Sequence, residues 1–138
     1  EKIIENKHGF IQVYNSHGDQ VVFGANVYDG KFNTDIFHNT NGIDRAYFLT
    51  TIRPKAKDAL VIGLSTGSWV KVLSMMPSLE KITVIEINPA YHDLIKSDPA
   101  ISRILKDRRI EIVFDDGRKW LKKNQNKKLF YTHFFFFF

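Results

Sequence analysis

The sequence predicts an α/β protein in which an N-terminal β-hairpin precedes a Rossmann-like parallel sheet. Apolar runs of strand length alternate with helix-like segments, which is typical of parallel strands joined by right-handed crossovers. The run 59–62 also meets a glycine-containing turn, 63–67, that leads directly into a helical pattern. Such a junction of strand, tight turn and helix is where α/β proteins bind anionic or nucleotide ligands.

Short β-prone runs form the N-terminal part of the chain. Residues 10–14 and 20–23 flank the turn-forming cluster 15–19, which predicts a hairpin, and residues 27–28 predict a third short strand. We therefore expect residues 1–38 to be an N-terminal β-hairpin region.

Residues 39–138 are expected to form the Rossmann-like domain. A helix over 39–51 is capped by Asn39 or Thr40 and ends at Arg53-Pro54. The elements that follow alternate in type: strand 59–62, helix 68–75, strand 82–87, a helix opened by Asn88-Pro89, a short helix from 97–99, strand 110–114, and a helix that carries Trp120. We expect Trp69 and Trp120 to pack in the core.

The run 130–138 stands where a fourth parallel strand is due. It ends in consecutive phenylalanines, which would make an aggregation-prone strand edge unless something covers them. A doubly wound sheet usually has about six strands. We therefore expect the chain to be a fragment that holds the first half of the domain and is incomplete at its C-terminus.

Composition limits the class of protein. The chain has 138 residues, of which 43% are hydrophobic and 25% charged, as in a globular domain. It has no cysteine, so disulfides and thiolate metal sites are excluded. No apolar stretch reaches the roughly 18–20 residues of a spanning helix. The net charge of +5 is explained by solvated helix faces, and no nucleic-acid partner is predicted.

Polar and glycine residues follow the ends of three predicted strands. The turn after the first strand holds Gly63, Ser65, Thr66 and Gly67; Glu86 closes the second strand; Asp115, Asp116 and Gly117 follow the third. The carboxyl ends of neighbouring parallel strands line one crevice, so these groups should converge there. Glycines admit a ligand close to the backbone, while carboxylates accept from ribose hydroxyls and an adenine amino group. The convergence predicts an adenosine pocket.

Each group also has an ordinary structural explanation. The turn can be only a turn, Glu86 can be a solvated strand-end carboxylate, and one of Asp115 and Asp116 can cap the next helix. The sequence 63–67 also fits G-x-S-x-G, with Ser65 as a hydrolase nucleophile, but the oxyanion loop and the acid and histidine in the required order are missing. The histidines show no spacing that predicts a metal site.

The runs DALVIGLSTGSWVKVL, ITVIEINPAY and IEIVFDDGRKWLKK resemble the spermidine synthase-like (aminopropyltransferase) family over residues 8–128. The resemblance implies the fold of S-adenosylmethionine-dependent methyltransferases behind a small β-hairpin domain. It implies a polyamine-biosynthesis transferase that binds decarboxylated S-adenosylmethionine and transfers an aminopropyl group to a diamine such as putrescine. Gly63, Ser65 and Gly67 would lie against the methionine-derived part, Glu86 would hold the ribose, and Asp116 with Gly117 would meet the adenine.

The chain departs from the family pattern at several positions. Thr66 stands where the family's glycine loop has the aspartate that grips the aminopropyl ammonium. The family's tyrosine-histidine pair is replaced around Asn41 and Gly42, and its glutamine aligns near Tyr28. The catalytic aspartate has no counterpart, so we expect the chain by itself to be inactive and name no catalytic residue.

Two alternatives stay open beside aminopropyl transfer. One is a methyltransferase that uses intact S-adenosylmethionine, which Thr66 would permit. The other is a non-catalytic nucleoside-binding or dimerisation module. No metal is expected. A cytoplasmic location, or the cytoplasmic face of a membrane protein, is expected, and a homodimer or a membrane segment in the longer parent is left open.

Overall fold

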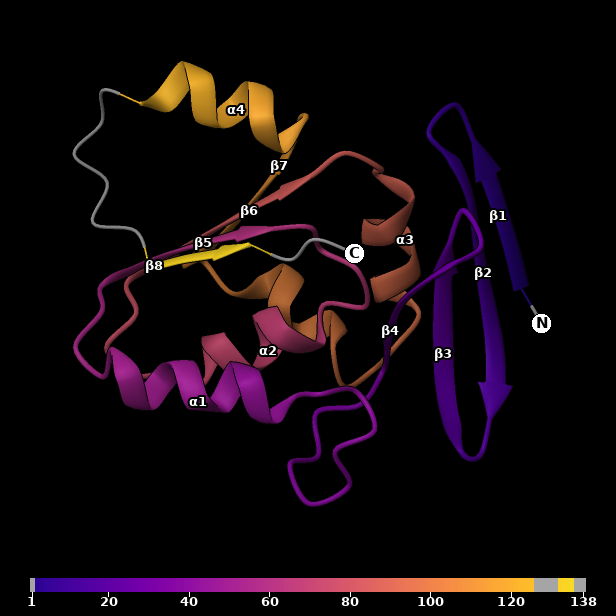
Figure 1. Ribbon diagram of the computed structural model, residues 1–138, viewed down its shortest axis with the longest axis horizontal. Helices are drawn as coiled ribbons and strands as arrows, with labels where there is room; N and C mark the ends of the chain where they lie inside the picture. The colour runs from indigo at the N-terminus through magenta and orange to yellow at the C-terminus, as the bar shows by residue number, and fades with distance from the viewer. Residues whose placement is uncertain (1, 126–131, 136–138) are drawn as a thin grey trace.

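The computed structural model describes residues 2–125 and the backbone of residues 132–135 (Figure 1). Two sheets of four strands each organise these residues. One is antiparallel and N-terminal, and the other is parallel and carries the helices. The α/β class with an N-terminal hairpin is thereby confirmed.

The antiparallel sheet has the strand order β1-β2-β3-β4. Its strands are β1 (Lys2–Asn6), β2 (Gly9–Ser16), β3 (Asp19–Gly24) and β4 (Val27–Lys31). The predicted hairpin is β2 with β3, and the predicted third strand is the start of β4. Strand β1 was not predicted, because most of its side chains are exposed and its sequence has no clear apolar alternation.

The parallel sheet has the strand order β7-β6-β5-β8. Its strands are β5 (Asp58–Ile62), β6 (Lys81–Glu86), β7 (Ile110–Phe114) and β8 (Thr132–Phe135). All pairs in this sheet are parallel, as predicted. Strand β8 confirms the expected fourth strand for residues 132–135, while the rest of the run 130–138 lies outside the described residues.

The helices follow the predicted order: α1 (Asp44–Ile52), α2 (Ser68–Ser74), α3 (Ala90–Lys96), the 3₁₀ helix η1 (Ser102–Lys106) and α4 (Gly117–Asn124). Helix α1 begins later than predicted, with Ile43 as its N-cap, so Asn39 and Thr40 are not caps. The Asn39 amide oxygen still accepts from the backbone N–H of Asp44. Pro89 is the N-cap of α3 rather than its first helical residue.

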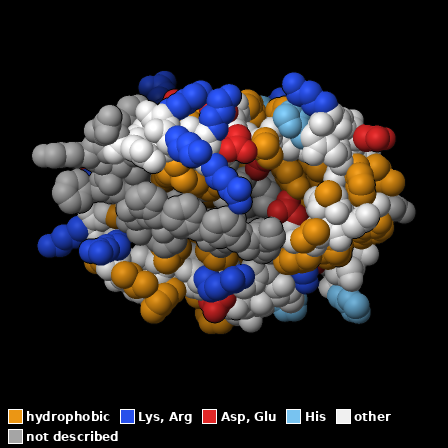
Figure 2. Space-filling model, turned by 45° about the horizontal axis from the view of Figure 1, so that its top comes forward, with side chains coloured by type: hydrophobic (Ala, Val, Ile, Leu, Met, Phe, Trp, Pro, Cys, Tyr) orange, Lys and Arg blue, Asp and Glu red, His pale blue; other side chains and the backbone are white. Residues whose placement is uncertain are grey.

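Helices cover both faces of the parallel sheet. In Figure 1, α1 and α2 lie below the sheet and α4 lies above it, while α3 lies between the parallel sheet and the antiparallel one. Figure 2 brings the top of that view forward and shows Lys and Arg side chains in the upper part of this face. Helix α4 contributes basic side chains on its solvated surface, which agrees with the explanation given above for the net charge.

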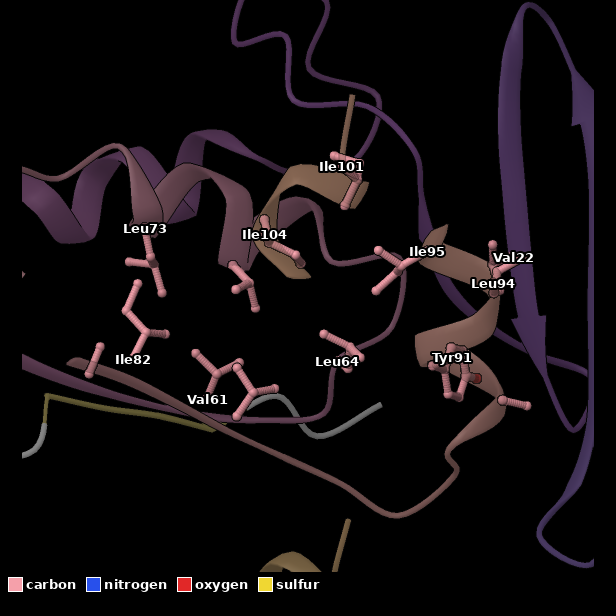
Figure 3. Close-up of a cluster of buried hydrophobic side chains, with 14 of the residues drawn as sticks. Val22, Val61, Leu64, Leu73, Ile82, Tyr91, Leu94, Ile95, Ile101 and Ile104 are labelled. Atoms are coloured by element: carbon pink, nitrogen blue, oxygen red, sulfur yellow. The ribbon is translucent and has the colours of Figure 1, made fainter. Parts of the chain in front are cut away.

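One buried apolar cluster joins the two sheets (Figure 3). Val22 of β3 lies beside Leu94 of α3, and Ile95 of α3 and Ile104 of η1 continue the cluster toward Val61 of β5. All of these side chains are at most 2% exposed. Because the antiparallel sheet buries its inner face against α3, strand β4 is held beside the carboxyl ends of the parallel strands.

Candidate nucleoside-binding site

A cavity of about 290 Å³ lies at the carboxyl ends of β5 and β6, on the side that faces β4 and the start of α1. Residues from these elements and from the turn 63–67 line it: Tyr28, Asp29, Gly30, Asn41, Arg45, Val61, Ile62, Gly63, Leu64, Ser65, Thr66, Ser68, Trp69, Val70, Glu86, Ile87 and Tyr91. The turn and Glu86 therefore share one cavity, as the topological argument for parallel strand ends requires.

The two glycines of the turn have different surroundings. Gly63 has φ +92°, and a Cβ added there would meet no atom of the described residues within 4 Å, so its backbone faces open space among them at the cavity. Gly67 has φ +74°, and a Cβ there would lie 2.9 Å from side-chain carbons of Ile95, Ile101 and Ile104. Gly63 is thus available to a ligand, whereas Gly67 allows α2 to pack against α3 and η1.

The hydroxyl groups of the turn bind the antiparallel sheet. The Ser65 hydroxyl donates to the carbonyl oxygen of Asp29, and the hydroxyls of Thr66 and Ser68 donate to that of Lys31 at 2.9 and 2.8 Å. Ser65 has φ +48°, an unusual conformation for a residue with a side chain. These bonds fix the turn against β4.

The same bonds bear on the hydrolase alternative. The Ser65 hydroxyl is engaged by a main-chain carbonyl, and the lining that the structure describes contains no histidine to act as its base. The geometry of these residues gives no support to Ser65 as a nucleophile.

Glu86 is a buried carboxylate, 5% exposed, that closes one side of the cavity. It accepts hydrogen bonds of 2.7 Å from the backbone N–H groups of Leu64 and Asn88. Each carboxylate oxygen can accept further bonds, so a ligand hydroxyl can still be held. Burial raises the pKa of Glu86 above its ordinary value, and the N–H groups of Leu64 and Asn88 oppose that rise.

The raised pKa of Glu86 predicts a pH dependence of stability. A carboxyl whose pKa is higher in the folded chain binds its proton more tightly there, so its contribution to stability is largest below the ordinary pKa of 4.5 and is lost as pH rises through the folded pKa. The free energy of unfolding of the wild type, minus that of Glu86→Gln, should therefore fall from pH 4 to pH 7. Urea unfolding of both proteins across this range measures the difference. A difference that rises with pH would contradict the expectation.

Asp115, Asp116 and Gly117 lie at the same edge of the sheet but outside the described lining of the cavity. The Asp116 carboxylate caps α4 by accepting from the backbone N–H of Lys119 at 2.9 Å. Asp115 forms ion pairs with Lys119 and Lys123. A Cβ on Gly117 would lie 2.7 Å from the side chain of Ile62, which does line the cavity.

Sequence reasoning missed several residues of the cavity wall. Asp29 lies on β4 and has its pKa raised by burial, with an opposing hydrogen bond from Tyr91. Arg45 lies on α1, over the ring of Trp69. Trp69 packs against the cluster of Ile43, Ala46 and Val72, as expected of a core residue, but it also lines the cavity. Nothing in the local pattern predicts that β4 and α1 reach the strand ends.

The described residues contain no group of three or more His, Asp or Glu side chains placed to hold one metal ion. Within the same residues, no helix combines the length and the apolar character needed to cross a bilayer.

The structure is that of a Rossmann-like protein with a cavity at the carboxyl ends of its parallel strands. No family model matches the sequence. The chain is 33% identical over 75 residues to a polyamine aminopropyltransferase of Alkaliphilus oremlandii, a match that covers 54% of this chain and 26% of that protein. It is 32% identical over 77 residues to a polyamine aminopropyltransferase of Agathobacter rectalis, covering 55% of this chain and 27% of that protein.

Solved structures share the fold of this chain. The fold is similar to that of spermidine synthase from Thermotoga maritima, with a TM-score of 0.71 at 19% identity over 88% of this chain and 42% of that one. A spermidine synthase solved in complex with the transition-state analogue AdoDATO matches equally well. The sequence matches and the shared fold confirm the predicted resemblance to spermidine synthase-like aminopropyltransferases. The matched stretch is about a quarter of the length of the curated relatives.

Proposed function

We propose that the cavity binds an S-adenosylmethionine-type nucleoside and that the chain is the donor-binding part of a spermidine synthase-like transferase. The observation that carries the proposal is the common cavity of Gly63, with its open backbone, and Glu86, with its buried carboxylate. A glycine turn after the first parallel strand and an acid at the end of the second are the two features that a nucleoside needs at this edge.

The proposed roles follow from these positions. Glu86 would accept hydrogen bonds from the ribose hydroxyls, because its carboxylate is held in place by two backbone N–H groups. The backbone of Gly63 and Ser65 would lie along the methionine-derived part. Asp116 and Gly117 remain proposed neighbours of the adenine through main-chain and remaining carboxylate atoms, while Gly67 would act through packing alone.

The activity proposed for the whole protein is transfer of an aminopropyl group from decarboxylated S-adenosylmethionine to a diamine such as putrescine. The support is the sequence similarity to polyamine aminopropyltransferases. A base and a carboxylate pair for the cationic diamine are needed for this chemistry, and we assign them to no described residue.

A second candidate is methyl transfer from intact S-adenosylmethionine. Two observations favour it: Thr66 directs its hydroxyl to the carbonyl oxygen of Lys31, where an ammonium-binding aspartate was expected from the resemblance, and Arg45 adds a positive charge to the cavity wall. A non-catalytic nucleoside-binding module would use the same pocket without an acceptor.

Calorimetric titration tests the binding proposal. The chain is expected to bind 5′-methylthioadenosine, which has the adenosine and the sulfur but no amino-acid part. The guanosine counterpart is the matched control, because it changes the base and leaves the ribose intact. Binding of the adenosine compound with at least tenfold preference over the guanosine compound is the expected result. Absence of binding, or equal binding of both, would refute the nucleoside assignment.

A further inference from the structure

Arg45 holds a positive charge at the wall of the cavity. It is the second residue of α1, and its guanidinium carbon lies 5.2 Å from the centroid of the Trp69 ring. Its Nε donates to the carbonyl oxygen of Gly42 at 3.3 Å. Within residues 2–125, Arg45 forms no ion pair. The Arg45 side chain is exposed, and no carboxylate among these residues pairs with its charge.

Packing at the start of α1 holds the backbone that carries Arg45 beside the cavity. Ile43 and Ala46 are fully buried against Val72 of α2, and Trp69 packs against the same cluster. Gly42 has φ +58°, and a Cβ there would lie 2.6 Å from an Nη atom of Arg45. The glycine thus leaves room for the guanidinium beside the indole. A planar guanidinium held on an aromatic face presents its remaining N–H groups along its edge.

The cavity has charges of opposite sign in its wall. Asp29 and Glu86 supply carboxylates on β4 and β6, and Arg45 supplies the cation on α1. The turn 63–67 leads from the end of β5 to the start of α2, and Trp69 lies in the first turn of α2. A nucleoside with its ribose at Glu86 and its chain along this turn would bring the far end of that chain toward Trp69 and Arg45.

We propose that Arg45 binds a carboxylate on the ligand, so that the cavity selects a nucleoside that still carries the methionine carboxylate over the decarboxylated form. The inference rests on the nucleoside site of the proposed function, since it needs the adenosyl nucleoside in this cavity, and it favours the second candidate activity over aminopropyl transfer. A guanidinium pairs with a carboxylate through two parallel, charge-assisted hydrogen bonds. The decarboxylated ligand offers only an ammonium group at that end, which would meet a like charge.

The consequence is a change of donor within a spermidine synthase-like fold. Selection of the carboxylated nucleoside favours intact S-adenosylmethionine, the donor of the second candidate function. It also explains why position 66 can be a threonine. If Arg45 binds the carboxylate at the end of the ligand, no aspartate beside the turn is required to bind the ammonium group.

Titration of the chain with three ligands tests the proposal. S-adenosylmethionine and its decarboxylated form differ only in the carboxylate, and 5′-methylthioadenosine lacks the whole amino-acid part. The wild type should bind S-adenosylmethionine at least about tenfold more tightly than the decarboxylated ligand, the lower end expected for a charge-assisted hydrogen bond. Arg45→Met, which keeps the aliphatic contact with Trp69, should lose that preference, and Arg45→Lys should keep part of it.

The ligand without the amino-acid part separates the possible failures. In Arg45→Met its affinity should stay within about twofold of the wild type, since Arg45 would not touch it. If the wild type binds all three ligands but prefers the decarboxylated one, or if Arg45→Met keeps the wild-type preference, the carboxylate role is refuted and the nucleoside site stands. If the wild type binds none of them, the proposed function fails as well. If Arg45→Met binds none of the ligands, two other measurements test the carboxylate role. A preference of the wild type for S-adenosylmethionine that is partly kept in Arg45→Lys supports the role, and a wild type without that preference refutes it.

Discussion

Replacing Gly67 by alanine is expected to destabilise the fold by about 2–5 kcal/mol, as the sum of overpacking and left-handed backbone strain. The added Cβ would lie 2.9 Å from side-chain carbons of Ile95, Ile101 and Ile104, which are fully buried and have little room to move. The φ of +74° adds the strain that a side chain brings to that conformation. Urea unfolding followed by circular dichroism measures the loss.

Gly63→Ala is the matched control. Its φ of +92° brings comparable strain, but in the part of the chain that the structure describes a Cβ there would meet no atom within 4 Å. It should therefore cost only about 1–2 kcal/mol of stability, the backbone part alone. Because its methyl group would project into the cavity, it should weaken ligand binding. Equal losses of stability in the two variants would show that the isoleucine contacts relax without cost.

Replacing Glu86 by alanine should weaken binding of 5′-methylthioadenosine by about 10- to 150-fold, equivalent to about 1.5–3 kcal/mol for charge-assisted hydrogen bonds to the ribose. The change also removes the acceptor for the N–H groups of Leu64 and Asn88, so the turn itself loses a support. Isothermal titration calorimetry gives the affinity, and thermal unfolding gives the separate cost to the fold.

Two further variants show which effect operates. Glu86→Gln keeps the size of the side chain and one carbonyl acceptor but removes the charge, so it should bind the ligand with intermediate affinity. Glu80→Ala removes an exposed carboxylate that pairs with Lys57 outside the cavity lining, and it should leave the affinity unchanged. Wild-type affinity in Glu86→Ala would remove Glu86 from the ribose site.

The parallel half of the fold could be predicted because its signals are local. Apolar runs such as 59–62 and 82–86 form largely buried strands, while the predicted last residue of the second run, Ile87, lies beyond β6 and is exposed. Turns or a proline mark where the helices end. Strand β1 could not be found in this way, since an exposed strand is defined by its pairing with β2 rather than by its own pattern. Strand β1 therefore forms because of its pairing with β2, which the sequence of β1 alone does not reveal.

For the candidate site too, the residues that follow from local signals could be predicted and those that depend on tertiary packing could not. Glu86 and the turn could be placed together because parallel strands end at one edge. Arg45 and Asp29 could not, because they reach the cavity through the packing of α1 on α2 and of β4 on the turn. The hydrogen-bond partners of individual atoms could not be predicted either. In the sequence the hydroxyls of Ser65 and Thr66 look suited to bind a ligand, yet in the structure both donate to carbonyl oxygens of β4.

Those serine and threonine hydroxyls have a consequence for energetics. The turn is bonded to the carbonyl oxygens of Asp29 and Lys31, so this part of the proposed binding surface is held in place by the docked antiparallel sheet. A ligand that recognises the docked arrangement must stabilise the docking by its own binding free energy, and the reverse holds by linkage. Docking of the N-terminal sheet and ligand binding are therefore thermodynamically coupled. Substitutions in β1 or β2 that weaken the docking should lower the affinity without contacting the ligand.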